Sequence, residues 1–282
     1  MHKTQPSLLT EVDHINTDIR SFLNQNGVIF KIFDQQDSGC VSYGVELNAQ
    51  RWFVKESSEP RTVESLRRAI ALHSLVQHTA LPRLHNAFKT PKNGLALVYD
   101  WLPGEILYDV SDFPGQAGQR DPKSAHARFC ALPVEKIIAA LSAIYDLHRV
   151  LAVAGFIAVD FYDGCILYDF VTESTFIVDL DEYRPGPFLN PTDRLYGSSR
   201  FMAPEEFQLG ARIDQITNVF TLGRTALVFL SDGDSSNWRG DIPAKTVIEK
   251  ATQPERANRY STVAEFVDAW KSALDQGRRT SA

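Results

Sequence analysis

The pattern of apolar residues changes once along the chain, at Pro103-Gly104, and this change limits the folds that the chain can adopt. Before it, residues 28–55 hold short runs of β-branched and aromatic residues separated by Asp, Ser, Gly and Asn, which is typical of strands. Leu95–Asp100 (LALVYD) predicts a further strand. Between Arg61 and His78 apolar residues recur near the helical period. The sequence therefore predicts a small sheet with one helix.

After that break the pattern becomes helical. The strongest helix is expected to begin at Pro133, because the residues that follow it place apolar side chains on one face. A short hairpin, CILY and then TFIVD, is expected next, and helical patterns return in Gln215–Leu230, Ala244–Ala251 and Thr262–Leu274. The polar segment Asp109–Ala131 is long enough to predict a functional insertion or a flexible lid.

These patterns predict an α+β fold, with a small β-rich lobe at residues 26–102 and a larger helical lobe at residues 103–282. Residues 1–25 are expected to form an N-terminal extension with an added helix, one face of which would carry Leu8, Leu9, Val12 and Ile15. We expect the whole chain to form one domain. Ligands prefer the clefts between two such lobes.

Composition excludes several classes of function. The chain has 282 residues and a formal net charge of −6, whereas nucleic acids and anionic membranes attract a basic excess, so neither is expected as a partner. No apolar run approaches the ~18 residues of a membrane span, and the N-terminus lacks a signal-peptide pattern, so a cytoplasmic protein is expected. Cys40, Cys130 and Cys165 form no CxxC pair, which argues against disulfides and a zinc site.

Carboxylates are concentrated in residues 155–205, among short strands and turns. Asp160 lies on a turn after the strongest helix, and Asp163 follows three residues later. Asp179 and Asp181 come at the end of the hairpin. Because residues two apart on an extended strand face the same side, these last two carboxylates are expected to offer oxygens to one site. The alternative interpretation is that Asp163 and Asp181 are solvated acids around turns.

Two features of the β-rich part are candidates for binding phosphate. Gly39 and Gly44 lie in the segment GCVSYGV, which ends at Val45, and glycine permits close approach of the backbone to a phosphate. Lys55 ends the strand WFVK, from which it could point into a cleft. The alternatives are an ordinary hairpin turn and a lysine at a solvated strand edge.

Taken in order, these segments resemble the protein kinase superfamily over roughly residues 27 to 275, and bacterial Ser/Thr protein kinases in particular. GCVSYGV is similar to the glycine-rich loop and WFVK to the strand with the phosphate-binding lysine. AVDFYDGC is similar to the catalytic loop, and VDLD to the metal-binding segment that follows it. GSSRFMAPE and PERANRY resemble the end of the activation segment and a later arginine motif.

The resemblance implies a two-lobed fold that binds ATP with Mg²⁺ (or Mn²⁺) and transfers the γ-phosphate to a hydroxyl acceptor. It implies that Lys55 contacts the phosphates, that Asp160 orients the acceptor hydroxyl, and that Asp179 binds the metal. Asp181 and Asp163 are further candidate metal ligands. The acceptor, a protein or a small molecule, is not named by the sequence.

The resemblance also implies where the nucleotide would bind. Gly39, Gly44 and Val45 would form the roof over it. The backbone carbonyl of Asp100 and the backbone amide of Leu102 would meet the adenine.

Several polar positions depart from the family pattern. Tyr162 stands where a lysine is expected, and Cys165 stands where a metal-binding asparagine is expected. A thiol is a poor ligand for Mg²⁺, which prefers hard oxygen ligands. Ala69 occupies the place of the helix glutamate that would pair with the lysine, since Glu64 lies more than a turn earlier and Glu56 is adjacent to the lysine.

Two framework contacts are expected from the same resemblance. Glu205 is expected to pair with an arginine near the C-terminus, and Arg259 fits that place. Asn218 is expected to accept hydrogen bonds from backbone N–H groups of the loop that contains Asp160.

Three functions stay open at this stage. The retained lysine and two carboxylates favour an active Ser/Thr-type protein kinase. A pseudokinase that binds a nucleotide or a partner without transferring phosphate is favoured by four departures from the family pattern, at Ala69, Cys165, Tyr162 and Val41. The polar segment Asp109–Ala131 favours a kinase that acts on a small molecule.

Overall fold

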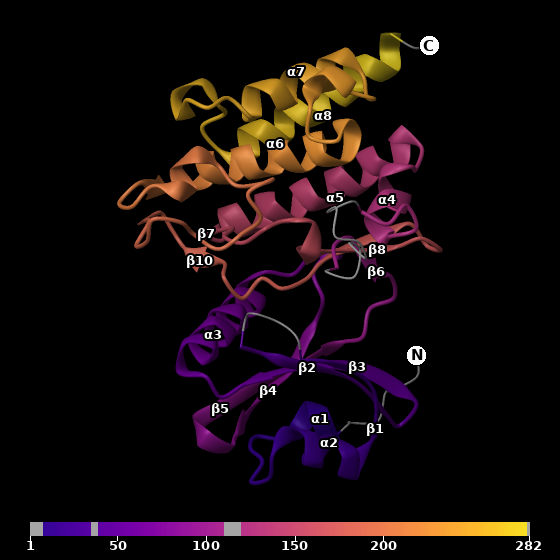
Figure 1. Ribbon diagram of the computed structural model, residues 1–282, viewed down its shortest axis with the longest axis vertical. Coiled ribbons are helices and arrows are strands. Elements are labelled where there is room, and N and C mark those ends of the chain that lie inside the picture. The colour runs from indigo at the N-terminus through magenta and orange to yellow at the C-terminus, as the bar shows by residue number, and fades with distance from the viewer. Residues whose placement is uncertain (1–7, 35–38, 110–119, 281–282) are drawn as a thin grey trace. The chain divides into compact units, whose positions relative to one another are not determined.

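The computed structural model describes residues 8–34, 39–109 and 120–280, and its fold mixes α-helices with β-strands (Figure 1). The chain divides into two compact units. Unit 1 comprises Met1–Gln77 and Pro82–Pro103, and unit 2 comprises His78–Leu81 and Gly104–Ala282. Over the described ranges, the helices are too short or too polar to cross a membrane.

Unit 1 is built on one antiparallel sheet whose strands follow the order β1-β2-β3-β5-β4. The strands are β1 (Val28–Phe33), β2 (Val41–Leu47), β3 (Gln50–Ser57), β4 (Leu84–Thr90) and β5 (Gly94–Asp100). In the described part of unit 1, three α-helices accompany them: α1 (Leu8–Glu11), α2 (Ile19–Asn26) and α3 (Pro60–Leu75). The sequence patterns miss β4, because a bulge between Leu84 and Asn86 breaks the alternation of side chains.

The two faces of this sheet pack against different helices (Figure 1). Trp52 and Val54 of β3 point to the face covered by α1 and α2, where they join a buried core with Leu9 and Leu23. Phe53 points to the other face and packs with residues of α3. The alternation along β3 therefore decides which side chains are core and which face α3.

The N-terminal segment is not the single helix that the sequence predicts. α1 has only four residues, and the chain then runs beside β4, where Lys89 N–H donates to the Asp13 carbonyl and Ile15 N–H donates to the Lys89 carbonyl (both 3.0 Å). α2 begins anew at Asp18, whose carboxylate accepts from Ser21 N–H at 2.9 Å. Pairing with β4 therefore interrupts the helix, and the segment becomes part of unit 1.

Unit 2 contains five α-helices among the described residues and three small antiparallel sheets. The helices are α4 (Ala125–Cys130), α5 (Val134–Val153), α6 (Gln215–Ser231), α7 (Ile242–Ala251) and α8 (Val263–Thr280). The sheets are β6-β8-β9, β7-β10 and β11-β12, formed by β6 (Glu105–Ile106), β7 (Phe156–Ile157), β8 (Ile166–Asp169), β9 (Ser174–Ile177), β10 (Arg184–Pro185), β11 (Phe188–Leu189) and β12 (Arg212–Ile213).

The predicted helices of unit 2 and the hairpin of β8 and β9 are present at the expected places. The short helix α4 lies within the segment expected to be a polar loop, where Ser124 caps it by accepting from Ala127 N–H at 3.2 Å. Most of the remainder of that segment, residues 110–119, lies outside the described residues.

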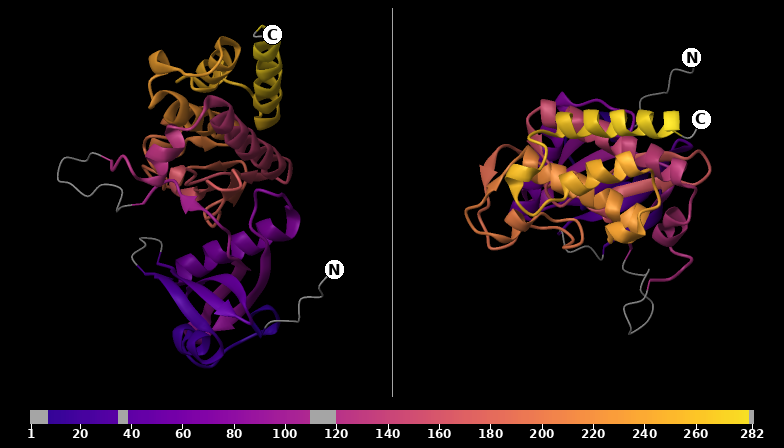
Figure 2. Two further views of the ribbon diagram at one scale, coloured as in Figure 1. Left: turned by 90° about the vertical axis from the view of Figure 1, so that its right-hand side faces the viewer. Right: turned by 90° about the horizontal axis from the view of Figure 1, so that it is seen from above.

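Helix α6 is the centre of unit 2. Nearly all of its residues from Thr217 to Ser231 are buried, and α5, α7 and α8 pack around it (Figure 2). The hydroxyl of Tyr145 on α5 donates to the Leu222 carbonyl of α6 at 3.0 Å, and the Tyr145 ring packs edge-on against Trp270 of α8. Polar side chains on α6 must therefore find partners inside the protein.

Asn86 ties the N-terminal segment to the sheet, since its side-chain amide donates to the carbonyls of Leu9 (3.0 Å) and Val12 (2.8 Å). We expect Asn86→Ala to lower the free energy of unfolding by about 1–3 kcal/mol, because two partly buried carbonyls lose their donor. Urea unfolding measures this, and limited proteolysis should show faster cleavage before residue 27. Asn24→Ala, at an exposed position of α2, is the control and should change stability by less than about 0.5 kcal/mol. Equal stability of the two variants would contradict a stabilising role for the Asn86 hydrogen bonds.

Candidate functional site

Lys55 is buried on β3, with 5% of its surface exposed. It lies two residues after Phe53 and so shares the face that packs against α3. Ala69 of α3, which stands where a glutamate was expected, is buried in the core of that face. None of the buried residues of α3 is acidic. Glu64 is exposed, and Glu56 accepts a hydrogen bond from the Thr90 hydroxyl at 2.7 Å.

The two glycines expected to cover phosphates have different surroundings. Gly39 has a positive φ of 74° and lies against Thr62 at the start of α3. Gly44 is buried within β2, where a Cβ atom would come within 2.6 Å of the Phe30 ring and 2.8 Å of the Trp101 ring. Aromatic rings therefore cover the backbone at Gly44.

These rings belong to a larger aromatic cluster in unit 1. The Phe30 and Trp101 ring centroids are 4.8 Å apart, and Phe33 and Phe53 lie within 6.5 Å of Trp101. The cluster packs on the same side of the sheet as Phe53, and therefore on the side of Lys55.

Val45 does not fit the predicted contact with a nucleotide. It is 1% exposed and belongs to the core beneath α1 and α2, on the face opposite Lys55, because the side chains of a strand alternate. The other two predicted adenine contacts are backbone groups at the end of β5 and after it. The Asp100 side chain forms a 2.7 Å contact with His85, while Leu102 lies just beyond the strand.

In unit 2, Asp160 and Asp179 share an uncommon backbone conformation. Their φ angles are +63° and +60°, in the left-handed region. The other non-glycine residues with positive φ in the described ranges lie in turns of two to four residues between adjacent antiparallel strands, or at the C-terminus of α6. Backbone strain outside turns and caps concentrates at functional sites. The two candidate catalytic carboxylates are therefore the two residues with this property.

Asn218 of α6 holds the loop that contains Asp160. The side-chain amide of Asn218 donates to the Ala158 carbonyl at 2.8 Å, and its carbonyl oxygen accepts from Ala158 N–H at 2.9 Å. The expected acceptance of a backbone N–H by Asn218 is thus confirmed. The second bond, in which Asn218 donates, was not foreseen, and an aspartate could not make it.

Cys165 closes the same loop. Its thiol donates to the Asp160 carbonyl at 3.2 Å, and its own carbonyl accepts from Val178 N–H at 2.9 Å. Cys165 is 2% exposed. The thiol therefore helps to fix the backbone of Asp160, whereas a soft sulfur atom is poorly suited to bind Mg²⁺.

A buried histidine connects this loop to the segment after Asp179. His148 Nδ1 lies 2.8 Å from the Ile144 carbonyl, which can only accept, so Nδ1 carries the proton. Nε2 then accepts from the Tyr183 hydroxyl at 2.8 Å. Burial lowers the pKa of His148 to about 4, so the imidazole is neutral at pH 7. Its ring packs 4.5 Å from that of Phe161, next to Asp160.

The argument that placed Asp179 and Asp181 on one side of a strand is wrong. β9 ends at Ile177, and the left-handed conformation of Asp179 turns the chain. Asp179 is exposed, whereas Asp181 is 8% exposed and lies in a turn. The backbone from Asp179 to Asp181 is not an extended strand, so their spacing of two residues does not place the two side chains on one side.

Asp163 faces cations. It is fully buried, and both of its carboxylate oxygens accept from Arg200 (2.7 and 2.9 Å), while His126 Nδ1 lies at 3.0 Å and Arg120 at 3.5 Å. Burial acts to raise the pKa of Asp163, but hydrogen bonds from His126 and Arg200 outweigh it and hold the pKa below its ordinary value. This set of partners does not fit the predicted metal ligand, because a metal ion would have to compete with two guanidinium groups.

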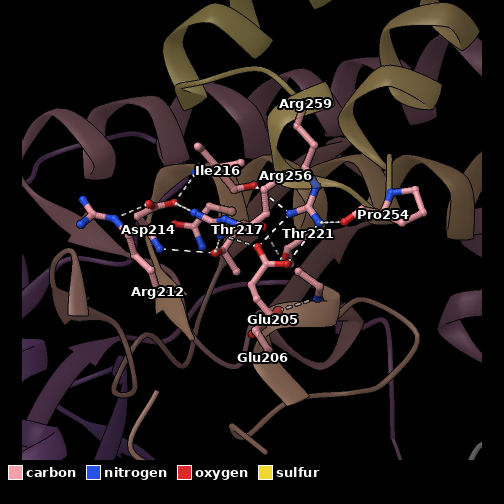
Figure 3. A network of polar contacts seen from close by, with 12 residues as sticks. Glu205, Glu206, Arg212, Asp214, Ile216, Thr217, Thr221, Pro254, Arg256 and Arg259 are labelled. Atoms are coloured by element: carbon pink, nitrogen blue, oxygen red, sulfur yellow. Dashed lines mark hydrogen bonds and ion pairs between the residues drawn. The ribbon is translucent and has the colours of Figure 1, made fainter. Parts of the chain in front are cut away.

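Glu205 anchors the segment that follows the carboxylates (Figure 3). Its oxygens accept from both terminal nitrogens of Arg259 (2.8 and 3.1 Å), which confirms the expected pair. Arg256 also reaches Glu205 at 2.6 Å and bridges to Asp214 at 2.8 Å. Burial acts to raise the pKa of Glu205, but the bonds from Arg259 outweigh it, so the pKa is lowered.

The neighbouring acid, Glu206, behaves in the opposite way. Its carboxyl accepts from Ala203 N–H at 2.6 Å but has no cation bonded to it in the described part of the chain. Burial raises the pKa of Glu206 to about 8. Two adjacent glutamates thus differ in charge at pH 7 because only one of them is paired with arginine.

Comparison with protein family models and with curated proteins gives no match for this chain. The interpretation of the site therefore rests on its own residues. Sequence reasoning missed Arg200, Arg256 and Glu206, and only Arg256 had a signal, since it lies in the PERANRY segment that also contains Arg259.

Arg259 is the fully buried partner of Glu205, with a side chain that is 0% exposed. We expect Arg259→Ala to lower the free energy of unfolding by about 3 kcal/mol, because it leaves a buried carboxylate short of donors. Urea unfolding measures the change. Arg212→Ala removes an ion pair to Asp214 from a 64% exposed side chain and should cost less than about 1 kcal/mol. Equal losses in the two variants would contradict burial as the cause.

Glu206 should make stability depend on pH. In the unfolded chain the carboxyl has its ordinary pKa near 4.5, whereas burial in the folded chain raises this pKa to about 8. Stability contributed by this group is therefore lost as pH rises from 4.5 to 8. We expect Glu206→Gln to gain stability relative to the wild type when urea unfolding is compared at pH 8 and pH 5. A difference that is the same at both pH values would show that Glu206 is already ionised in the folded protein.

Proposed function

We propose that this chain is an ATP-dependent phosphotransferase with a two-lobed, protein kinase-like fold, which transfers the γ-phosphate of ATP to a hydroxyl acceptor. The observation that carries the proposal is the left-handed backbone of Asp160 and Asp179, the two carboxylates to which the resemblance assigns the chemistry. Such strain persists only where the surroundings enforce it. Asn218 and Cys165 do so at Asp160.

In this proposal each group has one role. Asp160 accepts the proton of the acceptor hydroxyl, whose oxygen bonds to the γ-phosphorus as the bond from that phosphorus to the β–γ bridging oxygen breaks. Lys55 contacts the phosphates. Mg²⁺, when bound, would neutralise charge on the transferring phosphate.

The residues present fit a metal held mainly by the nucleotide. Mg²⁺ commonly takes one or two carboxylates together with substrate phosphates and waters. Asp179, two residues after the end of β9, has an exposed side chain. The Cys165 side chain has no oxygen to offer a metal ion. The strand geometry that favoured Asp181 as a metal ligand is absent.

A second candidate is a pseudokinase, and specific observations in unit 1 favour it. Phe30 and Trp101 cover Gly44, where open backbone was expected above a nucleotide, and α3 has no buried acid to orient Lys55. A chain with these features could bind a partner or a nucleotide without transferring phosphate. Nucleotide binding and phosphate transfer must therefore be measured separately.

We expect Asp179→Asn to reduce Mg²⁺-dependent ATP consumption at least about 100-fold, because it removes the metal-binding charge, with a nearly unchanged melting temperature. Asp193→Asn, an exposed position of the following segment, is the matched control and should keep full activity. Unaltered ATP consumption in Asp179→Asn would overturn the proposed role.

A thermal-shift titration of the wild type with ATP, with and without Mg²⁺ and Mn²⁺, separates the two candidates. A shift accompanied by phosphate transfer supports the phosphotransferase. A shift without transfer, with protein and metabolite acceptors both supplied, supports the pseudokinase.

A further inference from the structure

An open hollow of about 530 Å³ lies on unit 2, between the C-terminal half of α6, the turn that follows this helix and the end of α7. Its polar lining includes Arg224 of α6, Asp234 and Ser235 of the turn, and Glu249 of α7. A hollow of this size can hold a small molecule. The candidate catalytic carboxylates are not among the described residues that line it, so the hollow is separate from the site discussed above.

Arg224 is half-buried and has no acidic partner. In the described part of the chain, no carboxylate oxygen lies within 4.0 Å of its guanidinium nitrogens. Every other described arginine of unit 2 that is at least half-buried has a carboxylate within 3.5 Å. These arginines are Arg120, Arg149, Arg184, Arg200, Arg256 and Arg259. Burial and the charge of Arg200 lower the pKa of Arg224, as expected for a cation without a counter-charge.

Two backbone carbonyls hold the Arg224 side chain in place. Its Nε donates to the Arg200 carbonyl at 2.9 Å, and its Nη1 donates to the Gly233 carbonyl at 3.2 Å. A guanidinium has five N–H donors, so three remain, and the described residues offer no acceptor for them. A Cβ atom at Gly233 would lie 3.5 Å from Nη2, so the glycine leaves that nitrogen uncovered. The guanidinium is therefore oriented in advance and retains donors for an anionic group.

The acids that line the hollow are not fully matched with cations. Glu249 lies 3.7 Å from Lys245 Nζ. Asp234 is exposed and accepts from Ser236 N–H at 2.9 Å, and this bond lowers the pKa of Asp234, which is therefore ionised at pH 7. Among the described residues, no cationic nitrogen lies within 4.0 Å of the Asp234 carboxylate. Arg224 and Asp234 thus line one hollow but are too far apart to pair with each other.

We propose that this hollow binds a small zwitterion, a molecule that carries a carboxylate and a protonated amine, as amino acids do. Arg224 binds the carboxylate, because the planar fork of guanidinium donors matches two carboxylate oxygens. Asp234 binds the amine. A simple anion fits less well because two carboxylates line the hollow, and a simple cation leaves Arg224 without a partner. The site uses neither Asp160 nor Asp179, so it stands or falls separately from the proposed function.

The first test titrates the full chain with each of the standard amino acids in turn and follows binding by isothermal titration calorimetry. We expect at least one of them to bind. Its amide and its N-acetyl derivative each lack one of the two charges and should bind about tenfold more weakly, through loss of a charge-assisted hydrogen bond. Absence of binding by every amino acid overturns the proposal. Equal binding of the N-acetyl derivative would show that the hollow recognises only a carboxylate, which also overturns it.

The second test changes the cation. We expect Arg224→Gln to weaken binding of that amino acid about tenfold or more. Arg239→Gln is the matched control, because Arg239 also donates to two backbone carbonyls, those of Cys130 and Leu132, but is exposed and is not among the described residues that line the hollow. Ser235→Glu adds a carboxylate to the hollow without removing a donor of Arg224, and it should weaken binding as well. Unchanged binding in either folded variant overturns the proposal.

The third test changes the acid. Asp234→Asn keeps a side-chain oxygen that can accept from Ser236 N–H but removes the charge. We expect the amino acid to bind several-fold more weakly to this variant, while the N-acetyl derivative binds as it does to the wild type. Equal weakening of both ligands would show a general structural effect and would overturn the role of Asp234.

Discussion

The burial of helix α6 is the constraint on which the rest of unit 2 depends. A polar side chain on a buried helix must find a partner inside the protein, since an unpaired one costs free energy. Asn218 finds the backbone of Ala158, and Arg224 finds the carbonyl of Arg200. Thr217, near the start of the helix, accepts from Arg256, which also bonds Glu205. The loop of Asp160, the segment of Arg200 and the Glu205 network are thus fixed by the same helix.

The sequence predicted those elements whose formation depends mainly on a periodic pattern of buried apolar residues. Amphipathic helices and alternating strands were predicted because apolar spacing reports the face that is buried. The strand β4 was not predicted, because a bulge shifts the alternation of its side chains. The predicted N-terminal helix was too long, because backbone pairing with Lys89 interrupts it. The pairing with Lys89 joins segments far apart in the chain, and local apolar spacing encodes neither this pairing nor the bulge.

The candidate site divides in the same way. The pair of Glu205 and Arg259 and the support from Asn218 followed from motif order. The left-handed conformation of Asp179, which removed the argument for Asp181, has no signal in composition or spacing. Asp163 likewise reads as a loop acid in the sequence, and only the structure places Arg200 and Arg120 against it.

The departures from the family pattern fall into two kinds that differ in their physical effect. Asn218 and Cys165 keep the hydrogen bonds that fix the loop, Asn218 through two bonds to Ala158 and Cys165 through its single thiol hydrogen. These changes preserve geometry while they remove charge and a hard oxygen ligand.

In unit 1 the departures instead add bulk and remove an acid, because aromatic rings cover Gly44 and Ala69 stands in the core. Under the proposed function, the loop in unit 2 that would position an acceptor keeps its backbone hydrogen bonds, whereas the altered groups lie in unit 1, where a nucleotide would be held.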